Sequence, residues 1–293
     1  GSDAMAGVLV LEAHATPPRG SWNAELTGLY RSANHAVGSS VSAGANFGQL
    51  DAQFRFSTMD YADLAVPADS FTYIGTVLPL ENGQLKNTAG RERTFTGQLG
   101  YQRWVGRVHW KSRLFVSYFD QNAGMFAGSH GIPRFYQLTD DGARRDIDVP
   151  YQDVRHLKLI SRNELALPGD RHRLFVDLGY QRNLRDEYSA PHAHGDQYVA
   201  DDSLALSLNL QTITFNARDR WTLNKRTHLD LGMQSSLQAN RIGGFEFLLA
   251  QYEQQRVGGY AILEHEINRS LYLSGGLRYD YGAIQVSPFT EVR

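Results

Sequence analysis

The chain has 293 residues, of which 42% are apolar and 20% charged, with a net charge of −2 and no cysteine. The charge balance argues against nucleic acid as a partner, because surfaces that bind nucleic acid carry a basic excess. The absence of cysteine excludes disulfides, thiolate metal sites and cysteine nucleophiles. No apolar run reaches the roughly 20 residues of a membrane-spanning helix.

The first segment, Gly1 to Glu12, differs from everything after it. A Gly-Ser-Asp turn leads into the short apolar run Val8 to Leu11, which is too short for a helix and predicts a buried strand. A lone strand cannot satisfy its own backbone hydrogen bonds. Its partners must therefore lie elsewhere, either in the strands that follow or in residues outside the sequence.

From Pro17-Pro18 onward the sequence alternates apolar and polar residues in runs of roughly ten to fifteen. In the run 171–181, Leu174, Val176, Leu178 and Tyr180 fall on one face and polar residues on the other. No segment has helical periodicity, so the pattern predicts an all-β fold with antiparallel strands. Eleven strands are expected, at 21–32, 36–46, 49–59, 92–103, 107–120, 154–167, 171–186, 203–222, 227–240, 255–267 and 270–284.

The connections between these strands alternate in length. Turns of two to about four residues alternate with long segments such as 60–91 and 121–153, and only the first outer connection, near Asn34-His35, is also short. Outer-membrane β-barrels have short turns on one side and long loops on the other, whereas a soluble sandwich has no reason to alternate. The pattern favours a transmembrane barrel. A soluble sandwich would instead bury Leu229, Leu231 and Leu273 beneath a second sheet.

Several segments resemble one family. Gly1 to Glu12 resembles the end of the plug domain of TonB-dependent outer-membrane receptors. Four later segments look like strand ends and loops of the branch that takes up zinc, haem or siderophores: LKNTAGRER (85–93), GMFAGSHGIP (124–133) with 140–161, RDEYSAPHAHG (185–195) and NRIGGFEFLLAQY (240–252).

The resemblance implies a fragment of a larger receptor. Residues 1–18 would be the end of the plug and its linker, and residues 19–293 the first half of a barrel of about 22 strands. Gly1, Asp3 and Gly7 match plug-end positions with a structural role. The leader, the energy-coupling box, most of the plug and the second half of the barrel would then lie outside the sequence.

The resemblance also implies a function: energy-coupled uptake of a metal ion or metal chelate across the outer membrane of a Gram-negative bacterium. The partners would be the TonB complex, acting through the N-terminal part, and outer-membrane lipid; no cofactor, enzymatic activity or nucleic acid is expected. Two alternatives remain open. One is a lipid-cleaving barrel hydrolase, and the other is a passive porin with a charged constriction.

The loop sequence PHAHGD offers a candidate metal site. In extended backbone His192, His194 and Asp196 point the same way, which brings two imidazoles and a carboxylate together as ligands for Zn²⁺ or a similar ion. The alternative is an ordinary solvated loop.

The glycine-rich segment 124–133 offers a second candidate. His130, followed by Arg134 and Tyr136, is an expected substrate contact. Ser129 beside His130 could indicate a nucleophile, but adjacent loop residues rarely reach hydrogen-bond geometry. We favour a turn that closes a long loop.

The acidic run that follows has two interpretations. Asp140, Asp141, Asp146 and Asp148, interspersed with Arg144 and Arg145, could bind Ca²⁺ through clustered carboxylates. Ion pairing within the loop is the interpretation that we favour.

Overall fold

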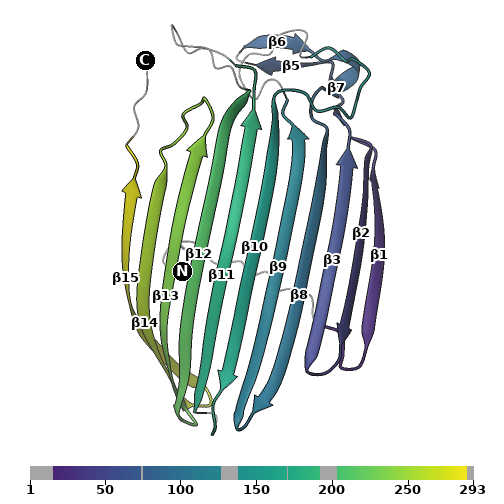
Figure 1. Ribbon diagram of the computed structural model, residues 1–293. Coiled ribbons are helices and arrows are strands. Elements are labelled where there is room, and N and C mark those ends of the chain that lie inside the picture. The colour runs from purple at the N-terminus through teal and green to yellow at the C-terminus, as the bar shows by residue number, and fades with distance from the viewer. Residues whose placement is uncertain (1–15, 74, 127–137, 170, 192–202, 289–293) are drawn as a thin grey trace.

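A computed structural model describes residues 16–73, 75–126, 138–169, 171–191 and 203–288. The chain folds into one antiparallel sheet of eleven strands in which every strand pairs with the next long strand along the sequence. The predicted all-β, antiparallel fold with eleven strands is confirmed. Figure 1 shows the strands side by side in a curved wall, with the long connections gathered at one end.

The observed strands correspond one to one with the predicted ones. Most extend further than expected at the end with the long connections, where β9 ends at Gly124 and β10 begins at Tyr151. Charged residues interrupt the apolar alternation there, but the backbone ladder continues. The strands are β1 (Trp22–Arg31), β2 (Ala36–Asn46), β3 (Leu50–Tyr61), β8 (Gly90–Val105), β9 (Val108–Gly124), β10 (Tyr151–Ala166), β11 (His172–Tyr188), β12 (Leu204–Asn224), β13 (Thr227–Gly243), β14 (Tyr252–Asn268) and β15 (Leu271–Val286).

The connection between β3 and β8 has structure of its own. Two small antiparallel pairs and a 3-10 turn stand above the wall, where the sequence predicted only a loop. Strands of two to four residues are too short to show a periodicity, which explains the omission. Among the described residues no helix is long and apolar enough to cross a membrane. The small elements are β4 (Leu64–Ala65), β5 (Ser70–Tyr73), β6 (Thr76–Pro79), η1 (Glu81–Gly83) and β7 (Gln84–Leu85).

The sheet has one apolar face and one polar face. Register partners share a face, so Leu178 lies beside Phe215 on one side and Ser161 on the other, on a surface that is mostly apolar. Leu231 is 43% exposed and Leu273 is 61% exposed, and within the described ranges no second sheet covers them. The described residues therefore do not form a sandwich. No large side chain among the described residues is fully buried, and buried apolar residues such as Ala89 and Leu138 lie near the long connections.

On β8 and β11 the apolar face forms a band of the same height. On β8 the outward positions between Arg93 and Arg103 hold only Phe95, Gly97, Leu99 and Tyr101. On β11 the outward positions between His172 and Arg182 hold only Leu174, Val176, Leu178 and Tyr180. Each interval contains nine residues, and tilted membrane-spanning strands need about 9–11.

Tryptophans mark one border of this band. Trp22 begins β1, Trp104 and Trp110 flank the turn between β8 and β9, and Trp221 lies near the end of β12. All four tryptophans of the chain therefore lie at the end with the short turns. Tryptophan is enriched where an apolar surface meets water at a membrane boundary.

Candidate functional site

The polar face carries the largest arrangement of charged side chains in the described part of the chain. A cavity of about 720 Å³ runs along it from β3 to β14. Such a surface would be solvated or covered by polar groups, since bare charges cannot face lipid. The charged and aromatic residues that line the cavity are Asp51, Tyr101, Lys111, Arg113, Phe115, Arg162, Glu164, Phe175, Asp177, Arg218 and Tyr260.

Arginines on this face lie over aromatic rings. The guanidinium carbon of Arg218 is 4.3 Å from the ring centre of Phe175, and that of Arg162 is 5.4 Å from Phe115. Asp177 lies directly opposite Arg162 in the register, beside the position of Phe175. Cations over rings are held in place without losing their charge. The cavity wall therefore presents ordered positive groups interspersed with carboxylates.

Glycines make room for the long side chains on this face. A Cβ at Gly232 would lie 2.3 Å from the Tyr260 ring, and one at Gly100 would lie 2.3 Å from the carboxylate of Asp51. Each side chain thus lies flat across the neighbouring strand, where only a glycine leaves space. Arg278 in turn lies over Tyr260, with 5.8 Å from guanidinium carbon to ring centre.

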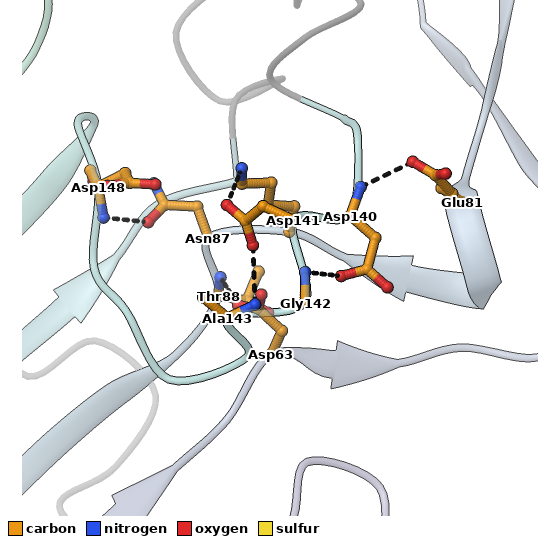
Figure 2. A network of polar contacts seen from close by, with 10 residues as sticks. Asp63, Glu81, Asn87, Thr88, Asp140, Asp141, Gly142, Ala143 and Asp148 are labelled. Carbon is orange, nitrogen blue, oxygen red and sulfur yellow. Dashed lines mark hydrogen bonds and ion pairs between the residues drawn. The ribbon is translucent and has the colours of Figure 1, made fainter.

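Above the wall, one asparagine ties the long connections together. The Asn87 side chain donates to the carbonyls of Met125, Asp148 and Pro150 at 3.1, 3.0 and 2.7 Å, and its oxygen accepts from the Asp148 amide at 2.9 Å. The last of these bonds is drawn in Figure 2. Asn87 has φ 62°, a left-handed conformation that asparagine tolerates better than most residues.

Asp63 binds the segment that contains Asn87 through two backbone amides. Its carboxylate accepts hydrogen bonds from the Thr88 and Ala89 amides at 2.7 and 2.9 Å (Figure 2). Burial raises the pKa of Asp63, while the amide bonds partly oppose that change. The connections 62–89 and 138–150 therefore form one hydrogen-bonded cap, named here the loop cap.

Three carboxylates gather on the loop cap. One oxygen each of Asp141, Asp146 and Asp148 lie within 4.8 Å of one another. Lys86 approaches this group, with Nζ 2.5 Å from Asp141. The hydrogen bond from Lys86 lowers the pKa of Asp141, whereas burial and then the neighbouring carboxylates raise the pKa of Asp146.

The sequence predicted that the acidic loop pairs its own charges with one another, and this prediction is wrong. Among the described residues, the ion pairs of this loop run out of it, from Asp141 to Lys86 and from Arg145 to Asp60. Arg145 also donates to the carbonyl of His35 at 2.7 Å. The contact with Lys86 holds the acidic loop against the rest of the cap, and the contacts of Arg145 tie it to the end of β3 and to the turn between β1 and β2.

The site residues expected from the sequence lie outside the described residues. They are the metal-site candidates His192, His194 and Asp196, the substrate-contact candidates His130, Arg134 and Tyr136, and the plug-end residues Gly1, Asp3 and Gly7. Their roles stay predictions. Sequence reasoning missed Asn87 and Asp63 as organisers of the loop cap. The available signal was the segment LKNTAGRER, which contains Asn87 and was recognised only as a family likeness.

Comparisons with known proteins find similar structures but no similar sequences. No protein-family model and no curated protein matches the sequence. The FrpB iron transporter from Neisseria meningitidis (F3-3 variant) matches at a TM-score of 0.62 and 16% identity, over 90% of this chain and 40% of that one. The apoprotein of its F5-1 variant matches at 0.61 and 17%, with the same coverage. This chain spans about two fifths of those transporters' length, and what it shares with them is the fold.

Proposed function

We propose that the chain is part of a TonB-dependent receptor of a Gram-negative outer membrane that takes up a metal ion or metal chelate. The observation that carries the proposal is the wall itself, with an apolar band one membrane thick backed by a charged face. The fold likeness to an iron transporter supports it.

In this proposal each part of the fold has a role. The apolar band contacts lipid, and the polar face lines a lumen closed by the second half of a barrel of about 22 strands. Residues 1–18 belong to a plug, and residues 19–293 form the first half of the barrel. The TonB complex acts through the plug to release cargo into the lumen.

The loop cap would receive cargo from outside. Its hydrogen bonds through Asn87 and Asp63 hold the outer connections in place before cargo arrives. Ligands from other loops would complete the binding site, with His192, His194 and Asp196 as metal ligands and His130, Arg134 and Tyr136 as further contacts. Imidazole and carboxylate together suit zinc and similar ions.

Deletion of the gene tests the function. Cells that lack the gene should accumulate less radiolabelled zinc, iron or haem than the parent strain when that cargo is limiting. If all three accumulate equally with and without the gene, the uptake function is wrong.

Variants in the intact protein test the metal site. His192→Ala combined with His194→Ala should lower accumulation of one cargo, while His109→Ala serves as the control because it lies at the short-turn end, against Trp104. Parental accumulation in the double variant would remove these histidines from the site and leave the uptake function standing.

A further inference from the structure

The two ends of the wall carry opposite charge. The five short connections hold five basic residues and one acidic residue, whereas the long connections hold eleven acidic and four basic residues. The basic residues of the short connections are Arg107, Arg171, Lys225, Arg226 and Arg269. The short-turn end therefore attracts anions near the border of the apolar band.

A groove crosses the apolar band close to that border. It has a volume of about 470 Å³ and lies on the first strands of the sheet, β1 to β9. Its floor consists of small residues, and larger apolar side chains form its walls. The floor residues are Ala43, Ala45, Ala52 and Gly97, and the walls include Trp22, Phe54, Phe95, Leu99 and Leu114.

Two arginines lie beyond the lower end of this groove. Arg103 shares a face with Leu99 and follows it by four residues, which is about 13 Å along a strand. Arg107 lies in the adjoining turn. Both are exposed, and neither has an ion-pair partner among the described residues. Tyr101 lies between Leu99 and Arg103 on this face, and its ring meets that of Trp110, the register partner of Arg103, edge to face at 5.7 Å.

We propose that this surface binds one anionic phospholipid, with an acyl chain in the groove and the phosphate between Arg103 and Arg107. The proposal rests on the membrane location proposed above. The proposal follows from the order of features toward the short-turn end, where the apolar groove is followed by the aromatic residues and then by the two unpaired cations. A phospholipid presents its acyl chain, its interfacial region and its charged headgroup in the same order.

The size of the groove favours a lipid chain over a partner helix. A helix with its side chains is about 10 Å wide and rises 5.4 Å per turn, so a single turn would occupy nearly the whole volume. A flexible acyl chain can follow a shallow floor of alanine and glycine. The two cations at its end then select an anionic headgroup over a zwitterionic one.

Tryptophan fluorescence provides the assay, because Trp22 lines the groove. The intact protein is placed in vesicles with brominated-chain phosphatidylglycerol or brominated-chain phosphatidylcholine. The quenching that the wild-type protein shows and the Trp22→Phe variant lacks reports lipid binding at the groove. We expect phosphatidylglycerol to bind about 25-fold more tightly, with about a fivefold contribution from each of the two arginines.

Matched variants separate the two halves of the site. Arg103→Gln should reduce phosphatidylglycerol binding about fivefold and leave phosphatidylcholine unchanged, whereas Arg93→Gln, on the same face at the far end of β8, should change neither. Ala52→Leu fills the groove floor and should weaken both lipids. Ala261→Leu, outside the groove on the same face, should weaken neither.

The outcomes distinguish this proposal from the proposed function. If neither brominated lipid quenches any tryptophan, the chain does not lie in a membrane and both proposals fail. If both lipids quench but Trp22 shows no preference for phosphatidylglycerol, or Arg103→Gln behaves like Arg93→Gln, the lipid site is wrong and the receptor function stands.

Discussion

Replacing Asn87 by alanine should open the loop cap without disturbing the wall. The asparagine is 6% exposed and is the shared partner of two carbonyls on either side of the acidic loop, Met125 and Pro150, and of both backbone groups of Asp148. Alanine removes every one of these bonds. It must also adopt the left-handed backbone that asparagine tolerates, because φ at this position is 62°.

The magnitude follows from two separate costs. The part-buried Asp148 amide would lose its partner, which costs about 1–3 kcal/mol, whereas the Pro150 carbonyl would keep its hydrogen bond from the Met125 amide. The left-handed backbone adds about 1–2 kcal/mol for a residue with a Cβ. We therefore expect the free energy of local opening of the cap to fall by about 2–5 kcal/mol.

Hydrogen exchange of backbone amides measures that opening. Asn87→Ala should reduce protection of the amides in 62–89 and 138–150, while the amides of β11 to β13 keep theirs and serve as the internal control. Gly124→Ala should act similarly, because its Cβ would lie 2.5 Å from Oδ1 of Asn87. Equal protection of the cap in wild type and both variants would refute the role of Asn87.

Three further predictions concern the two faces and the cap. Phe215→Arg, opposite Leu178 inside the apolar band, should lower the free energy of unfolding in lipid by about 2–4 kcal/mol, measured by denaturant titration. Gly232→Ala should cost about 1–3 kcal/mol in the same assay, because the added Cβ meets the tyrosine ring that crosses it. Lys86→Gln should raise the pKa of Asp141, followed by carboxyl chemical shifts, since the lysine lowers that pKa. Its ion pair stabilises the cap above the unfolded carboxyl pKa of about 3.9, by roughly 0–1 kcal/mol, and this is lost as pH falls through the lower folded value.

Each of these has a matched control. Thr214→Arg, on the polar face beside Phe215, should cost much less, and equal losses at the two positions would contradict the assignment of the faces. Gly275→Ala should be nearly neutral because nothing lies within 4 Å of its Cβ. An unchanged titration of Asp141 in Lys86→Gln would mean that the ion pair does not form.

The sequence predicted the wall well because the wall follows a local rule. Period-two alternation needs only neighbouring residues, and it persists wherever one face meets an apolar surface and the other meets a polar one. The predicted strands were too short near the long connections because the apolar surface stops there, while the backbone pairing continues. Tyr188, for example, still belongs to β11, although charged residues precede it.

The candidate site was less predictable because it depends on contacts distant in sequence. Asn87 reaches Asp148 across 61 positions, and the fit of Tyr260 over Gly232 depends on the register of two strands. The acidic loop shows the same limit. Composition indicated ion pairs, but their partners lie elsewhere in the chain, Lys86 in another connection and Asp60 in β3, and only the fold brings them near.

The pairing of each long strand only with its neighbours in sequence has a consequence for how such a wall assembles and evolves. Every ladder closes between segments adjacent along the chain, so the sheet can grow one hairpin at a time from a single edge. A hairpin gained or lost elsewhere leaves the remaining ladders intact and changes only the circumference, much as repeats are added to a linear array. The number of strands in such a sheet can thus diverge between descendants of one ancestor without any change in the rule that orders the strands.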